Sequence, residues 1–353
     1  MNARFAIPLV LLAAAGAVPA VAETGLWSAG STTLRAADSD FRLSASGVER
    51  RVVLPASVRV EELFPLRGGA FLSALVPAAS SGSAPSPRAD LFLALLDERG
   101  AHPLPNPASA RDESSARENA VPLTSAAGEL AGLVWLEGTD RQSYAVRHAL
   151  WDGMRWSEPA TLAESAAGSQ LALGAATLDD GSQLLIWSRF DGHDDEIVAA
   201  RFADGAWGPP QPIAPDNPVP DVTPTVVAVP GGALAAWSRY DGHDYRVVIC
   251  RFDGREWSAP AWAGPPGSTA PLLIPRPEKA LTGRSGGETT AAWLTYANSL
   301  PRGWEVAEVD GAGRPRRRGR AVDVPFSRPA VEATADGAVR LRWASGESVV
   351  ELR

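Results

Sequence analysis

Two octapeptides of this 353-residue chain are nearly identical: Trp187-Ser188-Arg189-Phe190-Asp191-Gly192-His193-Asp194 and Trp237-Ser238-Arg239-Tyr240-Asp241-Gly242-His243-Asp244. Their tryptophans lie 50 positions apart. An internal repeat of this length is typical of supersecondary units that stack or that are arranged around an axis. The two octapeptides therefore predict a repeat architecture.

The repeat extends in both directions from these octapeptides. Tryptophans recur at steps of 52, 50, 56 and 50, namely Trp135, Trp187, Trp237, Trp293 and Trp343. The clearest unit divides into four apolar runs, Thr225–Pro230, Ala233–Ser238, Tyr245–Phe252 and Glu256–Ala261. Gly-Gly and Asp-Gly pairs between the runs supply the positive φ that tight hairpins need. Four short antiparallel strands per unit describe a blade of a β-propeller. We therefore expect an all-β fold, a propeller of about six blades, with seven as the other count that the sequence allows.

The two ends of the chain suggest how the ring closes. The last unit, 326–353, has three strand-like runs and lacks a fourth. Gly25-Leu26-Trp27-Ser28, near the N-terminus, matches the fourth-strand sequence Arg255-Glu256-Trp257-Ser258. We expect residues 23–34 to complete the last blade, because this pairing would cover an exposed sheet edge.

The remaining segments complete one predicted domain, 23–353. Residues 41–119 are expected to form a divergent first blade that carries mobile Pro/Ser-rich inserts at 78–88 and 106–119, and residues 120–325 hold the clear repeats. The segment 1–22 has a basic start, an apolar run and a small-residue cleavage site, which is typical of a signal peptide. The sequence thus predicts a periplasmic or secreted protein without a transmembrane anchor. Cys250 is the only cysteine, which excludes an intrachain disulfide.

The net charge and the absence of several sequence motifs exclude some classes of function. A formal net charge of -8 argues against a nucleic-acid partner, because such proteins need positive charge to neutralise phosphates. The sequence has no phosphate loop, haem-attachment motif or dinucleotide fingerprint. It therefore assigns no catalytic residue and predicts no cofactor.

A turn motif resembles that of a known family. Arg251-Phe252-Asp253-Gly254-Arg255-Glu256-Trp257, with related stretches at 203–207 and 151–156, resembles a shortened Asp-box of the sialidase-like BNR-repeat propellers. The resemblance is best over residues 120–265. It implies that the motif joins the third and fourth strands, that its aspartate caps the turn and that its aromatic residue packs between blades. The family's catalytic arginines, tyrosine and acids have no counterpart that can be placed here, so the resemblance is structural.

The octapeptide turns are the best candidates for a functional site. They are expected to join second and third strands and to share a face with the loops between blades, such as 216–221. The predicted ligand or partner face consists of Arg189, Asp191, His193, Asp194, Arg239, Asp241, His243 and Asp244. The main alternative is a purely structural turn, since Asp-Gly is what a tight hairpin needs. A divalent metal held by the histidines and carboxylates is the weaker alternative.

Two further features stand outside the repeat. Trp262 and Trp304 are possible platforms for stacking on a sugar or an apolar partner, if they are exposed. The basic run Arg314–Arg320 either binds an acidic ligand or forms a solvated, poorly ordered hairpin tip.

The functional hypothesis is an exported, non-catalytic propeller that binds a protein partner at the cell envelope, or a glycan. The alternative is a glycan-processing enzyme, which would need Asp and Glu side chains with raised pKa values at one mouth of the channel.

Overall fold

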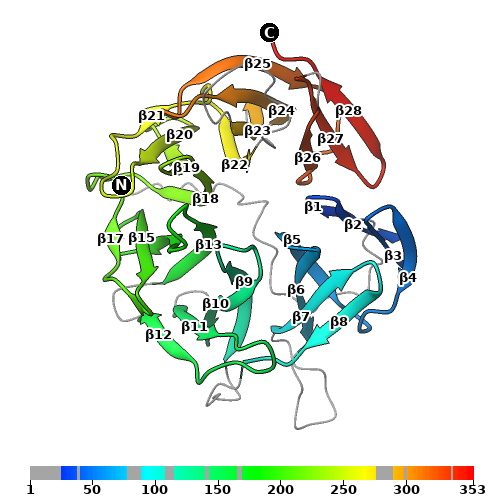
Figure 1. Cartoon of the computed structure of the whole chain (residues 1–353). Helices are drawn as coiled ribbons and strands as arrows, with labels where there is room; N and C mark the ends of the chain where they lie inside the picture. The colour runs from blue at the N-terminus through cyan, green and yellow to red at the C-terminus, as the bar shows by residue number, and fades with distance from the viewer. Residues whose placement is uncertain are drawn as a thin grey trace.

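The fold is a ring of seven antiparallel sheets (Figure 1). The computed structural model describes residues 25–37, 40–77, 89–107, 115–139, 143–164, 169–275, 289–297, 300–334 and 337–353. These residues form 28 strands and no helix, and consecutive strands build consecutive blades. None of the described residues belongs to a helix long and apolar enough to cross a membrane. The chain is thus a β-propeller, as predicted, with the higher of the two expected blade counts.

The first strand of each blade lies nearest the centre of the ring in Figure 1. Blade 1 comprises β1 (Gly25–Ala29), β2 (Thr32–Ala37), β3 (Asp40–Ala45) and β4 (Val48–Val52), and blade 2 comprises β5 (Arg59–Leu66), β6 (Gly69–Pro77), β7 (Ala89–Asp97) and β8 (Gly100–Leu104). Blade 3 comprises β9 (Ala116–Thr124), β10 (Leu130–Gly138), β11 (Ala145–Leu150) and β12 (Ala160–Ala163), and blade 4 comprises β13 (Gln170–Thr177), β14 (Gln183–Phe190), β15 (Asp195–Ala203), β16 (Ala206–Trp207) and β17 (Gln211–Pro212). Blade 5 comprises β18 (Asp221–Val229), β19 (Gly232–Tyr240), β20 (Tyr245–Phe252) and β21 (Ala261–Trp262), and blade 6 comprises β22 (Ser268–Pro275), β23 (Thr289–Ala297), β24 (Leu300–Val309) and β25 (Pro315–Ala321). Blade 7 comprises β26 (Ala330–Ala333), β27 (Val339–Trp343) and β28 (Gly346–Val350).

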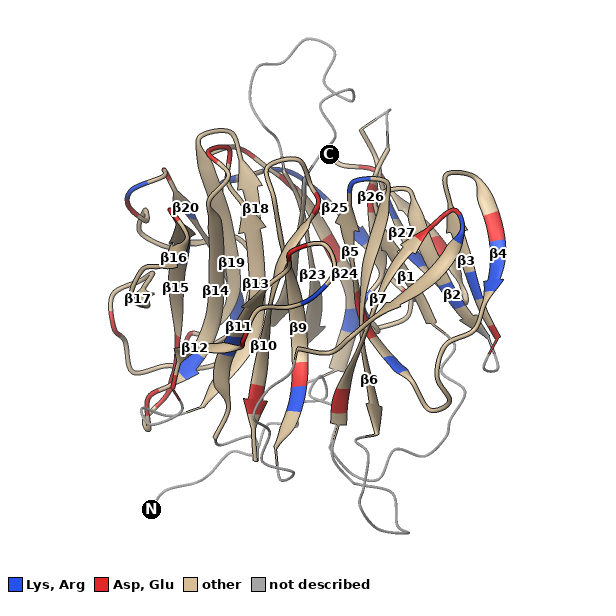
Figure 2. Cartoon of the chain, turned by 60° about the horizontal axis from the view of Figure 1, so that its bottom comes forward, with Lys and Arg blue, Asp and Glu red and all other residues tan. Residues whose placement is uncertain are grey.

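Apolar side chains between neighbouring blades form the core. Six clusters of buried residues each combine two consecutive blades, from the junction of blades 1 and 2 to that of blades 6 and 7. The repeated tryptophans lie in the second strands and pack against the preceding blade, and all five are buried. Charged residues lie mainly at the turns and on outer strands such as β4 (Figure 2). The repeat predicted from the sequence is therefore the packing unit of the ring.

The innermost strands of blades 3 to 6 share a distortion. In each of them, two residues bulge opposite the repeated tryptophan of the second strand. The first residue of each bulge has a positive φ: Asn119 (52°), Ala172 (53°), Thr223 (55°) and Ala270 (51°). This region is unfavourable for residues other than glycine, so the surrounding structure must stabilise it. Contacts between blades contribute, because Ser238 Oγ of blade 5 accepts a hydrogen bond from Ala270 N of blade 6 at 3.0 Å.

The N-terminal strand does not complete the last blade, so this prediction was wrong. β1 pairs with β2 across a two-residue turn and is the innermost strand of blade 1. Gly30 in that turn has a φ of 57°, which glycine adopts without strain. Such a short hairpin loop costs less entropy to close than a pairing between the two ends of the chain. Where the last blade meets the first, β1 contacts β26 and β27, and Arg35 Nη2 donates to the Ala344 carbonyl at 3.0 Å.

The region 41–119 also differs from its prediction. It contains β3 and β4 of blade 1, the whole of blade 2 and the start of β9, so it is more than one divergent blade. The second strands β2 and β6 carry no tryptophan, which is why the repeat was not visible there. Residues 78–88, 108–114 and the predicted signal peptide 1–22 lie outside the described residues.

The turns between third and fourth strands behave as the Asp-box resemblance implies. Asp253 Oδ1 accepts hydrogen bonds from Arg255 N and Glu256 N, each at 2.9 Å. Trp257, at the end of this turn, packs on the apolar cluster between blades 4 and 5. Asp152 caps the turn of blade 3 in the same way. The motif thus has a structural role in these blades.

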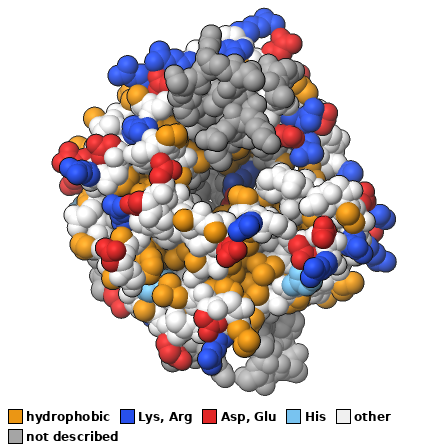
Figure 3. Space-filling view, in the orientation of Figure 1, with side chains coloured by type: hydrophobic (Ala, Val, Ile, Leu, Met, Phe, Trp, Pro, Cys, Tyr) orange, Lys and Arg blue, Asp and Glu red, His pale blue; other side chains and the backbone are white. Residues whose placement is uncertain are grey.

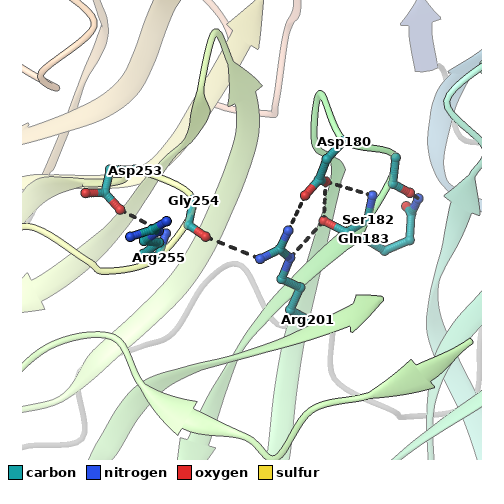
Figure 4. Close-up of polar contacts among 8 residues, drawn as sticks. Asp180, Ser182, Gln183, Arg201, Asp253, Gly254 and Arg255 are labelled. Atoms are coloured by element: carbon teal, nitrogen blue, oxygen red, sulfur yellow. Dashed lines mark hydrogen bonds and ion pairs between the residues drawn. The ribbon is translucent and has the colours of Figure 1, made fainter. Parts of the chain in front are cut away.

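An arginine of the third strand ties such a turn to the blade before it. Arg201 of β15 donates from Nη1 to the Gly254 carbonyl at 3.2 Å and from Nε to Ser182 Oγ at 2.8 Å, and it pairs with Asp180 (Figure 4). Arg251, its equivalent in β20, donates to the carbonyl of Gly311 in blade 6. These bonds join neighbouring blades on the face opposite to the octapeptide turns.

The basic run Arg314–Arg320 is not a hairpin tip. Most of it forms β25, where Arg318 and Arg320 pair with Glu305 at 2.6 and 3.1 Å. The neighbouring strand β24 therefore supplies the negative charge that this run faces.

Candidate functional site at the junction of blades 4 and 5

The octapeptides end in the turns between second and third strands, as predicted. One turn joins β14 to β15, and the other joins β19 to β20. Asp191 Oδ1 accepts hydrogen bonds from His193 N at 2.8 Å and Asp194 N at 3.2 Å. These backbone donors stabilise the ionised carboxylate and so lower the pKa of Asp191. The first aspartate of this turn thus acts as a structural cap.

The second turn repeats this geometry. Asp241 Oδ1 accepts hydrogen bonds from His243 N at 3.0 Å and Asp244 N at 2.9 Å. These bonds also lower the pKa of Asp241. The turn touches the loop between blades 4 and 5, because Tyr240 N donates to the Pro220 carbonyl at 3.1 Å. The shared face that the sequence predicted is therefore present.

A buried ion pair stands beneath the second turn. Asp221, the first residue of β18, is fully buried, and it lies directly opposite Arg239 of β19. Arg239 Nε donates to Oδ1 at 2.8 Å, and Nη2 donates to Oδ2 at 2.5 Å. The guanidinium also lies over the ring of Trp237, with Cζ 5.6 Å from the ring centre. This bidentate geometry fixes both side chains.

Two other buried carboxylates lie beside this pair with oxygens that have no hydrogen-bond partner. Glu196 Oε1 accepts from Asn217 N at 3.2 Å and Nδ2 at 3.1 Å, whereas its Oε2 is buried and unpartnered. Asn217 Nδ2 is also 3.5 Å from Asp221 Oδ2, so one amide connects two carboxylates. Asp194, which is 8% exposed, likewise has an unpartnered Oδ2. Buried oxygens without partners are costly, and two of them lie in this cluster.

The carboxylates repel one another. Burial, with the carboxylates of Asp221 and Asp194, raises the pKa of Glu196 to about 7. Burial is also the main cause that raises the pKa of Asp195 to about 6, and it raises the pKa of Asp194 with help from Asp191. A positive charge placed near these acids would stabilise their ionised forms.

The carboxylate cluster is surrounded by arginine, aromatic and further acidic side chains. Arg189 Nε is buried without a partner, and Phe190 exposes 37% of its surface. The rings of Tyr240 and Tyr245 lie 5.5 Å apart. We call the following set the acidic face: Asp191, Asp194, Asp195, Glu196, Asp216, Asp221, Asp241 and Asp244, with Arg189, Arg239 and Arg246. Acids outnumber arginines in this set, so the face attracts positive charge. On the face of the molecule that Figure 3 shows, charged side chains of both signs lie among hydrophobic ones.

The eight residues predicted for the partner face divide into three groups. Arg189, Asp194 and Arg239 belong to the partly or fully buried cluster, and Asp191 and Asp241 cap the turns. The remaining three, His193, His243 and Asp244, are exposed. Among the described residues, no three His, Cys, Asp or Glu side chains are grouped so that they could hold a metal ion. A partner role for this face remains a prediction.

The two candidate stacking tryptophans have different environments. Trp262 exposes 45% of its surface, and the Arg246 guanidinium lies over its ring at 4.5 Å. Trp304 is 2% exposed, and its Nε1 donates to the Pro325 carbonyl at 3.2 Å. Trp304 therefore does not meet the condition of exposure on which its stacking role depended, because this ring fills the core between blades 6 and 7.

Sequence reasoning missed Asp195 and Glu196 as members of the site. The two octapeptides are followed by Asp195-Glu196 in one copy and by Tyr245-Arg246 in the other. In a repeat protein, positions where the copies diverge are the ones that common packing does not determine. This divergence was the available signal.

Comparisons with known proteins support the fold. No protein-family model matches the chain, and no curated protein matches it. A protein of unknown function from Dyadobacter fermentans is similar in structure, with a TM-score of 0.53 and 12% identity over 84% of this chain and 94% of that one. The BP39L lectin from Burkholderia pseudomallei has a TM-score of 0.52 and 11% identity, over 91% of this chain and 93% of the lectin. A chain from a study of two prolyl endopeptidases has a TM-score of 0.50 and 14% identity, over 90% of this chain and 44% of that chain. At such identities the similarity establishes the fold alone.

Proposed function

We propose that this propeller is an exported binding module whose acidic face receives a positively charged segment of a protein partner at the cell envelope. The observation that carries the proposal is the pair of buried, unpartnered carboxylate oxygens on Glu196 and Asp194. Neither oxygen accepts a hydrogen bond within the chain, and Arg239 is already engaged by Asp221. A lysine or arginine of a partner would supply the missing charge and hydrogen bonds.

The rigid geometry around the cluster supports this role. The turn caps of Asp191 and Asp241 fix the loops on either side, and the Asp221–Arg239 pair fixes the floor. A preorganised acidic surface speeds encounter with a basic partner and selects against acidic ones. The exposed Phe190 provides an apolar contact at its edge.

The test is calorimetric binding of a lysine- and arginine-rich peptide to the mature chain, residues 23–353, at low and high salt. Glu196→Gln and Asp194→Asn keep the side-chain shapes and remove the charges, so each is expected to weaken binding about tenfold. Glu256→Gln, on the opposite face, is the matched control and should leave the affinity unchanged. Equal binding of all variants, or binding that does not depend on salt, would reject the acidic face as the site. Natural partners would then be sought by pull-down from an envelope extract.

A second candidate is glycan processing, which the acid pair favours. Glu196, whose pKa is raised to about 7 by burial, lies close to the carboxylate of Asp221, and glycosidases use a pair of neighbouring carboxyl groups. The structural similarity to a lectin also favours a carbohydrate ligand for this fold. Turnover of chromogenic glycosides that Glu196→Gln abolishes would favour the enzyme. Absence of turnover with intact peptide binding would favour the interaction module.

Export itself is testable by fractionation of cells that produce the full chain. We expect the processed protein outside the cytoplasm, with cleavage after Ala22. A cytoplasmic protein that retains residues 1–22 would reject this part of the proposal.

A further inference from the structure

A pocket of about 550 Å³ lies between the outer strands of blades 3 and 4, away from the acidic face. His148 of β11 and Thr161 and Leu162 of β12 form one side. Blade 4 contributes Phe202, Trp207 and the Gly-Pro turn that follows it. The volume falls within the range of small-molecule sites.

Two buried polar atoms at this pocket have no partner. They are the ring nitrogen Nδ1 of His148 and the indole Nε1 of Trp207. The two rings meet edge to face, with centroids 5.9 Å apart. Buried N–H groups are normally paired, and at this pocket an unpaired indole lies next to an unpaired imidazole.

The other junctions show what is unusual here. Trp156 occupies the position of Trp207 in the preceding blade, and its Nε1 donates to the Pro105 carbonyl of blade 2 at 2.6 Å. His148 occupies the strand position held by Ala199 in blade 4 and Ile249 in blade 5, which are buried. At this junction an imidazole thus replaces an apolar residue, and the indole lacks the carbonyl partner that Trp156 has at the junction of blades 2 and 3.

The lining specifies the chemistry of a ligand. It contains aromatic rings, prolines, glycines and one hydroxyl, and no Asp, Glu, Lys or Arg. Burial is the main cause that lowers the pKa of His148, and the charge of Arg147 is the second. The imidazole therefore stays neutral at pH 7. A neutral imidazole nitrogen accepts a hydrogen bond, and the indole donates one. A ligand hydroxyl can serve both at once.

We propose that this pocket binds one ring of a neutral saccharide, whose hydroxyl accepts from Trp207 Nε1 and donates to His148 Nδ1 while its apolar face lies against the aromatic wall. The combination of aromatic surface with a few fixed polar atoms suits such a ring. An acidic or basic sugar finds no opposite charge among the lining residues. This site is independent of the acidic face.

The test is titration of the mature chain with D-glucose, D-galactose, L-fucose and N-acetyl-D-glucosamine, followed by the indole N–H resonances in an NMR spectrum. Trp207→Phe assigns the Trp207 signal, because it removes that N–H and keeps an aromatic ring. We expect at least one of these sugars to shift the Trp207 signal in a saturable way. Loss of either polar atom should weaken binding about tenfold.

Variants copied from the other blades keep the test interpretable if folding is affected. His148→Ile and His148→Ala introduce the residues that blades 5 and 4 have at this position. Trp257→Phe alters the equivalent ring at the next junction and should change the affinity less than about twofold. No saturable shift with any of the four sugars, or equal affinity in the His148 variants, would overturn the proposal and assign the two nitrogens to a bound water. His148→Ala should not change peptide binding to the acidic face, so this result is separable from that of the peptide experiment.

Discussion

Arg239 and Asp221 form the one bidentate ion pair of the acidic face, with Nε to Oδ1 at 2.8 Å and Nη2 to Oδ2 at 2.5 Å. Both side chains come from neighbouring strands of blade 5, and the carboxylate has no exposed surface. The pair therefore holds the innermost strand to the second strand at the end that carries the octapeptide turn.

Removing one partner of this pair should be costly. Arg239→Ala leaves a buried carboxylate without its counter-charge, and we expect it to lower the free energy of unfolding by about 3–5 kcal/mol. Urea denaturation measures the change. The double variant Asp221→Ser with Arg239→Thr copies the facing pair Ser268 and Thr295 of blade 6, and it should recover part of the loss. A double variant no more stable than Arg239→Ala would contradict this account.

The stability of the protein should depend on the charge of Glu196. Its pKa of about 7 in the folded state lies above the ordinary value of 4.5, so the folded state binds the proton more tightly than the unfolded state does. The stabilisation is complete below pH 4.5 and is lost as the pH rises through about 7. Glu196→Gln should therefore raise the free energy of unfolding by about 1–2 kcal/mol at pH 8 and not at pH 4.5. Exposed Glu256→Gln is the control, and a gain that is the same at both pH values would refute the titration of Glu196 as the cause.

The contact of Arg201 with the next blade should stabilise the ring. Arg201→Ala removes its bonds to Gly254, Ser182 and Asp180, and we expect a loss of about 1–2 kcal/mol in thermal or urea unfolding. Arg255→Ala is a matched control, because this exposed arginine lies in the same turn and its backbone N makes the capping bond. If both variants lost the same stability, the contact between blades would not be the reason.

The bulge in β13 offers a test of backbone strain. Ala172 has a φ of 53°, where an alanine is strained and a glycine is not. Ala172→Gly should therefore be neutral or stabilising by up to about 1 kcal/mol, since relief of strain exceeds the entropy that glycine adds to the unfolded chain. Ala175→Gly in the same strand, which has no positive φ, should destabilise by about 0.5–1 kcal/mol. The denaturant midpoints of the two variants measure these changes. An equal loss of stability in both variants would argue against backbone strain at Ala172.

Sequence patterns located the later blades well because one large residue repeats there. Trp187 and Trp237 lie in second strands that pack in the same way in each blade. The repeat length and the order of the strands could therefore be predicted from the tryptophan positions. Blades 1 and 2 pack with Leu34 and Leu72 in their second strands, and leucine is too common to reveal a period. The N-terminal strand was assigned to the wrong blade. The sequence around Trp27 is similar to that around Trp257, but this similarity does not specify which neighbouring strand it pairs with.

The site could be predicted only in part. The octapeptides lie on the face that holds the carboxylate cluster, and Arg189, Asp194 and Arg239 belong to this cluster. The unpartnered oxygen of Glu196 depends on burial and on the position of Asn217, which the three-dimensional packing determines. The pocket at His148 was likewise invisible, since it arises from the relative placement of two blades.

The meeting of β1 with β26 and β27 has a consequence for how such a ring can change. Within the described residues, the first and last blades each keep their own sheet, and side chains join them. A duplicated or deleted repeat at this boundary would interrupt no hydrogen-bonded ladder. A gene could therefore gain or lose a whole blade in one event, with the fit of the side chains between blades deciding which ring size closes.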